Sequence, residues 1–204
     1  MMKTTLLSLL VLAAATRVAL ASPQTFDFKD PKGVNNATFK LDAPLEAIQG
    51  SANGISGSIT FDPQNPAATK GKIVVTTESL RVPNPMMNEH LHGGQWMDAA
   101  KFTEISFESE ELKNISSSGD TTSAEVVGTL TIKGVAKRIS VPVKLTYLKD
   151  KLGQRVPNMK GDLLVLRSTF NIKRSDFGIN PGAPTDKVSD RIELSLSVAG
   201  AAAH

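Results

Sequence analysis

The chain has 204 residues, a formal net charge of +3 at pH 7 and no cysteine. The missing cysteine excludes disulfides, thiol catalysis and iron–sulfur ligation, so the fold must be held together by its apolar core. The small net charge favours no nucleic-acid partner, and the length is that of a single domain.

The first 21 residues have the pattern of a cleavable secretory signal. Lys3 precedes an apolar run over residues 6–15, and an A-x-A sequence ends at Ala21. The run is too short to span a bilayer. We therefore expect an exported protein whose mature part is a single domain over residues 22–204.

Short segments with a period of two fill the first part of the mature chain, which is typical of strands with one apolar face. Gly57 interrupts one of them, at a point where a missing side chain relieves crowding in a curled sheet. We expect strands over residues 25–29, 37–42, 55–61 and 72–80, with a weaker strand or irregular connection over 44–54.

Residues 82–101 break this alternation with two prolines and two adjacent glycines. A long apolar loop in an all-β domain is often a lid, so we expect one or two short helical turns over one end of the sheet. Its apolar residues are adaptable enough to line an entrance. They are Met86, Met87, Leu91, Trp96 and Met97.

The second half of the chain returns to strands. Residues 126–147 form two alternating runs around Gly134, which predicts an antiparallel hairpin. Pro142 cannot donate to a ladder and indicates an edge, a bulge or an unpaired position in that hairpin. A polar loop is expected over residues 114–123, and further strands over 105–112, 164–173 and 188–198.

Eight or nine strands with short connections predict an all-β antiparallel barrel or sandwich. The inward positions are almost all aliphatic or phenylalanine, so the interior should be apolar. Alternation alone does not distinguish cavity wall from packed core. The inward positions considered for a cavity are Ile59, Phe61, Ile132, Val141, Val143, Phe170, Ile172 and Leu194.

Several motifs follow one another in a characteristic order. They are Gly57-x-Ile59-x-Phe61-Asp62, His90-Leu91 with Gln95-Trp96-Met97-Asp98, Lys101-Phe102-x-x-Ile105-x-Phe107, Gly128-x-Leu130-x-Ile132-Lys133-Gly134-Val135-x-Lys137 and Arg174-x-Asp176-Phe177-Gly178-Ile179. This order resembles the YceI family of exported lipocalin-like proteins. The resemblance implies a bacterial, periplasmic protein with an eight-stranded antiparallel barrel and a short helical lid.

The resemblance also implies an elongated apolar cavity that binds a long isoprenoid lipid, such as a polyprenyl phosphate or the tail of an isoprenoid quinone. A carrier of this kind needs no further cofactor, and it is compatible with transient membrane contact and with a homodimer. No G-x-S-x-G, H-E-x-x-H or phosphate-binding glycine loop is present, so we expect no enzymatic activity.

Three polar residues are candidates for the mouth of the cavity. His90 lies in the lid segment, while Arg174 and Asp176 follow a long strand. An arginine fork suits a phosphate or carbonyl head group, and the alternative is a structural ion pair or turn that closes the barrel end.

Two other functions remain open from the sequence. One is haem or metal binding through His90 and His92, although no third ligand stands out. The other is a stress-related interaction module whose barrel is filled by side chains.

Overall fold

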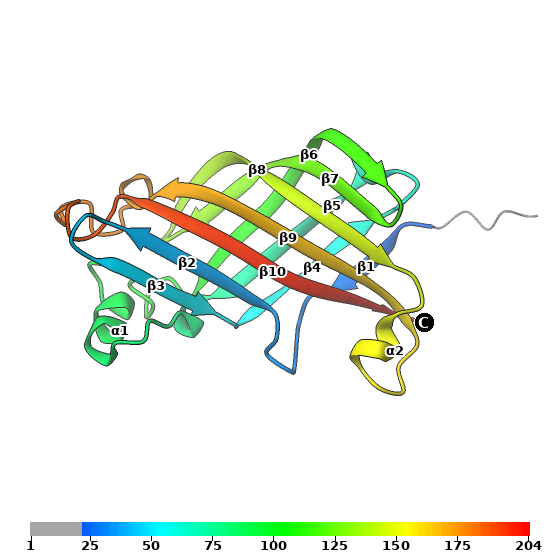
Figure 1. Ribbon diagram of the computed structural model, residues 1–204, viewed down its shortest axis with the longest axis horizontal. Coiled ribbons are helices and arrows are strands. Elements are labelled where there is room, and N and C mark those ends of the chain that lie inside the picture. Colours follow the sequence, from blue (N-terminus) through cyan, green and yellow to red (C-terminus); the bar gives the residue numbers. More distant parts are fainter. Residues whose placement is uncertain (1–21) are drawn as a thin grey trace, which may run out of the picture.

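The computed structural model describes residues 22–204, and the predicted signal peptide lies outside the described residues. Ten strands and a few short helices make up this part of the chain (Figure 1). The strands are β1 (Gln24–Asp27), β2 (Asn36–Asp42), β3 (Ala47–Ala52), β4 (Ile55–Phe61), β5 (Lys70–Thr76), β6 (Glu104–Ser118), β7 (Thr121–Ile132), β8 (Val135–Leu148), β9 (Gly161–Lys173) and β10 (Arg191–Ala203). The helices are α1 (Pro85–His92) and α2 (Leu152–Arg155), with 3-10 turns η1 (Pro66–Ala68), η2 (Thr77–Ser79) and η3 (Ser175–Phe177).

Eight of these strands close into an antiparallel barrel. The order is β1-β4-β5-β6-β7-β8-β9-β10, and β10 returns to β1 through the pair Asp27 and Ala201. This confirms the predicted all-β barrel. Closure leaves few free sheet edges, which suits a core held without disulfides.

The strands β2 and β3 extend the wall at the α1 end. There β10 pairs with β2 over Glu193–Ser197, and β2 pairs with β3. A bridge between Ser51 and Arg81 then joins β3 to the chain that leads into α1. The predicted weaker strand is therefore a genuine part of the wall.

The predicted polar loop over residues 114–123 is wrong. β6 runs to Ser118 and β7 starts at Thr121, so the two strands form a long hairpin. Residues 113–120 are all exposed, because the hairpin tip projects beyond the barrel (Figure 1). A strand pair with no buried face has no apolar alternation to reveal it.

The apolar interior forms two clusters along the barrel axis. One surrounds Phe26, Phe28 and Leu164, and the other surrounds Ile132 and Phe177. Side chains at four half-buried positions pack against both clusters, so the interior is continuous from end to end. They are Val75, Phe107, Ile139 and Phe170.

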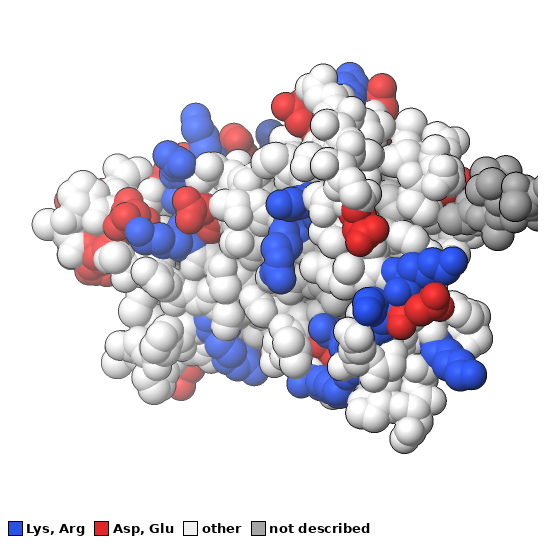
Figure 2. Space-filling model, turned by 45° about the vertical axis from the view of Figure 1, so that its right-hand side comes forward, with Lys and Arg blue, Asp and Glu red and all other residues white. Residues whose placement is uncertain are grey.

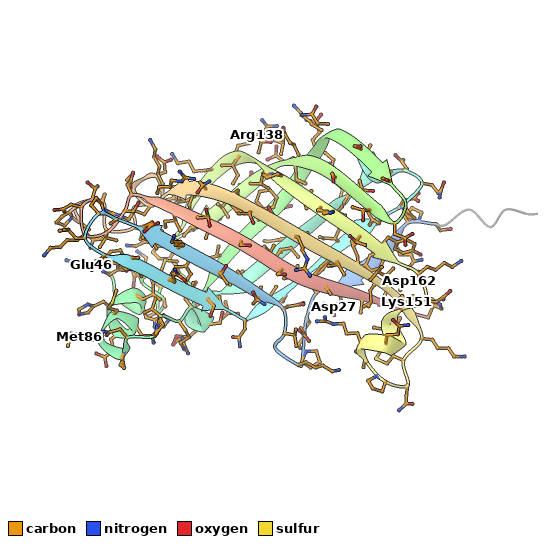
Figure 3. All side chains as sticks on the ribbon, in the orientation of Figure 1. Asp27, Glu46, Met86, Arg138, Lys151 and Asp162 are labelled. Carbon is orange, nitrogen blue, oxygen red and sulfur yellow. The ribbon has the colours of Figure 1, made fainter. Side chains whose placement is uncertain are left out.

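A buried carboxylate organises the end of the barrel opposite α1. Asp162 is 2% exposed and accepts hydrogen bonds from the Tyr147 hydroxyl at 2.6 Å, the Asp150 amide at 2.7 Å and Gln24 Nε2 at 2.9 Å. Figure 3 shows Asp162 far from Glu46 and Met86, which lie at the α1 end. Burial raises the pKa of Asp162, but these hydrogen bonds together lower it by more than burial raises it. The pKa of Asp162 is therefore below its usual value.

Basic and acidic side chains are interspersed on the face shown in Figure 2, with no large area of one sign. Within residues 22–204, no helix is long and apolar enough to cross a membrane.

The Tyr147–Asp162 pair predicts a loss of stability at high pH. Burial and the adjacent carboxylate raise the pKa of Tyr147 from 10.0 to about 12. The neutral phenol therefore stabilises the fold fully below pH 10.0, and this contribution is lost as the pH rises towards about 12. Urea unfolding of the wild type and Tyr147→Phe across this range should show a smaller decline in the variant. Equal declines would contradict the pair's role.

Candidate functional site

The barrel contains a cavity with two adjoining compartments. The deep compartment has a volume of about 180 Å³, and the mouth compartment beneath α1 has about 320 Å³. Five residues line both, so the compartments adjoin one another along the barrel. These junction residues are Phe39, Leu80, Ile105, Ile132 and Leu194.

The deep compartment is almost wholly apolar. Its walls come mainly from strands of the barrel and from β2, and no charged side chain of the described chain lines it. Two serines there are already engaged with the backbone: Ser109 Oγ bonds the Gly71 amide and carbonyl, and Ser168 Oγ donates to the Pro142 carbonyl at 2.6 Å. The compartment therefore offers a ligand surface contact rather than directed polar interactions.

The helix α1 and the loop that follows it, which lie at one end of the barrel (Figure 1), line the mouth. Pro85 occupies the first turn, and the Asn84 side chain caps the helix by accepting from the Met87 amide at 3.1 Å. After the helix the chain folds back, and the Met97 amide donates to the Leu91 carbonyl at 3.0 Å. The predicted lid segment thus forms one helix with a tightly bonded return.

Most of the sequence-predicted apolar residues line this cavity. The deep wall includes Ile59, Val141, Val143 and Phe170, and the mouth wall includes Met87, Leu91, Trp96, Met97 and Ile172, while Ile132 and Leu194 lie at the junction. His90 also lines the mouth, beside Met87 and Leu91 of α1.

Two of the predicted residues lie elsewhere. Phe61 is buried in the core with its ring centroid 6.3 Å from that of Tyr147, and it does not border the cavity. Met86 is 68% exposed on the outer side of α1 (Figure 3). One residue of helix turns the direction by about 100°, which separates Met86 from Met87.

The surroundings of Arg174 favour the structural alternative over the head-group role. Its side chain is 1% exposed, and all its nitrogens donate to backbone carbonyls of the loop after η3. The acceptors are the carbonyl oxygens of Ile179, Asn180, Ala183, Val188 and Ser189. Because Ile179 and Val188 line the mouth, Arg174 positions part of that wall. Asp176, by contrast, is exposed on η3.

The two lid histidines do not face one another. They stand two residues apart on α1, which places them about 200° apart around the helix axis. His90 lines the mouth, while His92 Nε2 lies 3.4 Å from Arg81 Nη1. This arrangement does not present two imidazoles to one metal ion.

Another group with metal-ligand potential comprises Asp150, Asp162 and His204. It lies at the opposite end of the barrel, and both oxygens of Asp162 already accept hydrogen bonds.

Sequence reasoning missed part of the site. Phe39, Leu80 and Ile105 belong to the junction, and Glu46 lines the mouth. The alternation around Phe39 and Ile105 carried a usable signal for the inward face. Glu46 sits between β2 and β3, where no alternation indicates direction.

The profile of the YceI-like domain matches residues 25–199. The chain belongs to the YceI family. A UPF0312 protein of Yersinia pestis is 37% identical over 153 residues, which are 75% of this chain and 73% of the relative.

Solved structures of similar shape include BcnA of Burkholderia cenocepacia, with a TM-score of 0.67 and 21% identity over 81% of this chain and 95% of that one. Another is described as a polyisoprenoid binding domain from Saccharophagus degradans. It has a TM-score of 0.64 and 11% identity over 89% of this chain and 99% of that one. These two likenesses agree with the YceI barrel described above.

Replacing Arg174 should destabilise the fold. Arg174→Met would leave several buried carbonyls without donors, and we expect a loss of about 3 kcal/mol or more in the free energy of unfolding. Urea unfolding measures this, with Asp176→Asn as the control, because Asp176 is exposed in the same motif. A cost for Arg174→Met no larger than that for the control would show that the carbonyl network is not structural.

Proposed function

We propose that this protein is a periplasmic carrier for a long isoprenoid lipid and that it catalyses no reaction. The observation that carries the proposal is the pair of adjoining apolar compartments, one at the mouth under α1 and one inside the barrel, which share the junction residues. The structural likeness to a domain described as polyisoprenoid binding supports the choice of ligand class. The secretory pattern of residues 1–21 supports the location.

Apolar burial alone can supply enough free energy to bind a long isoprenoid chain tightly. A ligand of about 40 carbons at roughly 0.3 kcal/mol per heavy atom would bind by about 12 kcal/mol, which is near the nanomolar range. An extended prenyl chain suits the elongated space. A barrel filled by side chains, as an interaction module would have, does not agree with this cavity.

Native mass spectrometry of the exported protein tests the proposal most directly. We expect a stoichiometric prenyl compound that survives purification and is identified after extraction. A protein that is empty, and that also refuses added prenyl quinones and polyprenyl phosphates, would overturn the carrier proposal.

A substitution at the junction tests whether the ligand spans both compartments. Leu194→Trp should block the passage, so that affinity for a 40-carbon prenyl chain falls at least about tenfold, since each excluded methylene forfeits about 0.8 kcal/mol. Affinity for a 10-carbon chain should change much less. Fluorescence competition measures both, with Met86→Trp as the control outside the cavity. Unchanged long-chain affinity in Leu194→Trp would contradict binding through the junction.

A further inference from the structure

The ionisable groups of the mouth are unusual for a site that would receive an anionic head group. Glu46 and His90 are the ionisable residues that line the cavity, and within residues 22–204 no lysine or arginine lines either compartment. Glu46 lies at the same end as Met86 (Figure 3). A phosphate or diphosphate at this position would meet a carboxylate.

Three cations next to the cavity wall donate to backbone carbonyls outside the cavity. Lys133 Nζ donates to the carbonyls of Gly94 at 2.9 Å, Gln95 at 3.1 Å and Gly178 at 3.2 Å. Arg81 Nη1 donates to the carbonyls of Glu78 and Leu80. Arg174 is saturated by carbonyls, as described above.

Cations on the strands that form the mouth point outward. Lys40 pairs with Asp42 at 2.8 Å, and Arg191 Nε donates to Asn171 Oδ1 at 2.8 Å. Both residues are neighbours in sequence of inward residues, so the strand period of two directs them to the surface. The fold therefore supplies cations around the mouth and directs none of them into it.

We propose that the cavity selects isoprenoids with an uncharged head, such as a quinone or a prenyl alcohol, over prenyl phosphates and diphosphates. This inference rests on the proposed function and specifies its ligand. An anionic head would lose its hydration at the mouth without gaining a guanidinium or ammonium partner, and the Glu46 carboxylate would repel it.

The test compares two lipids of the same chain, geranylgeraniol and geranylgeranyl diphosphate, in equilibrium competition against a fluorescent prenyl probe. The wild type should bind the alcohol at least about tenfold more tightly, because the desolvated diphosphate finds no opposite charge. Glu46→Lys should reduce or reverse this ratio. Glu89→Lys is the matched control, since Glu89 is an exposed acid of α1 outside the cavity and the change in net charge is identical.

The outcomes separate this inference from the carrier proposal. If neither lipid binds the wild type, the proposed function fails and the selectivity fails with it. If the diphosphate binds as tightly as the alcohol, the selectivity alone is overturned. The same holds if Glu89→Lys changes the ratio as much as Glu46→Lys, because the effect would then be a general one of net charge.

A second, independent observation concerns the wall between β8 and β9. The ladders of β7 with β8 and of β9 with β10 run along nearly the whole strands, but β8 pairs with β9 only over Lys144–Leu148. Residues 135–143 of β8 and 168–173 of β9, which we call the seam, have no ladder partner across this gap. Pro142 lies in the seam and has no amide hydrogen to donate.

The seam is bounded at both ends and lies directly against the cavity. The Lys144–Arg167 pair begins the ladder at one end, and Lys133 Nζ reaches the Gly178 carbonyl at the other. Ser168 Oγ, which donates to the Pro142 carbonyl, bonds across it. Val141, Val143, Ser168 and Phe170 all line the deep compartment just behind.

We infer that the seam is a lateral port through which the prenyl chain enters and leaves the barrel. This inference also rests on the proposed function. Side-chain packing is easier to part than a ladder of backbone hydrogen bonds, and Ile139 and Phe170 of the seam pack against both apolar clusters. The lid loops at the mouth are bound together by Lys133 and by the Asn180 amide, which donates to the Gln95 carbonyl at 2.9 Å.

A covalent bridge across the seam tests the port, and the cysteine-free chain makes such bridges specific. The double variant Ser140→Cys, Asn171→Cys carries two exposed thiols, one on each edge of the seam. A short bismaleimide then joins the two thiols. The control pair is Lys144→Cys with Arg167→Cys, which the same reagent joins across an existing ladder pair. The readout is the rate at which each protein takes up a prenyl quinone from vesicles.

The bridged seam should take up lipid at least about tenfold more slowly than the same variant before bridging, since a pinned edge restricts local opening. The bridged control should load at its unbridged rate. Equal rates before and after bridging the seam would overturn the port while leaving the carrier proposal intact. A wild type that loads no lipid would overturn both.

Discussion

The pairing of β10 is the constraint on which the barrel depends. A 13-residue strand presents backbone groups on two edges, and buried groups of this kind must be paired. One edge is covered by β9 along its whole length. The other edge is shared, with β2 bonded towards the α1 end and β1 bonded at Ala201. This division makes the barrel long and adds β3 to the wall of the mouth.

The same architecture explains why an apolar interior remains partly empty. Inward residues from opposite walls must meet at the axis to fill a barrel, and an eight-stranded barrel is just wide enough for a slender ligand instead. Here the packed end is closed by Phe26, Phe28 and Tyr147, whereas the middle and the α1 end are lined by aliphatic and aromatic side chains around open space. Stability and binding capacity therefore reside in different parts of one continuous core.

Sequence alternation predicted the strands and most of the cavity wall, because a buried face imposes a period of two. It failed where no face is buried, as in the hairpin tip around Gly119, and where the local geometry is helical, as at Met86. For Arg174 the sequence left a structural role open beside the head-group role, but it could not identify the partners, since backbone carbonyls leave no mark on the sequence. Phe61 is an inward residue that packs in the core and does not border the cavity, and alternation does not distinguish these two environments.

Apolar binding of the proposed kind has a consequence for how a carrier exchanges its ligand. A prenyl chain that moves from a bilayer into this cavity passes from one apolar medium to another, so the large hydrophobic term measured against water nearly cancels. The remaining difference depends on chain ordering, wall contacts and the fit of the head group. Because these terms are small and of opposite sign, loading and release need no chemical energy source. In such a carrier, a mouth that within residues 22–204 is lined by no lysine or arginine would influence which lipids exchange, and the apolar wall would retain them during transit through water.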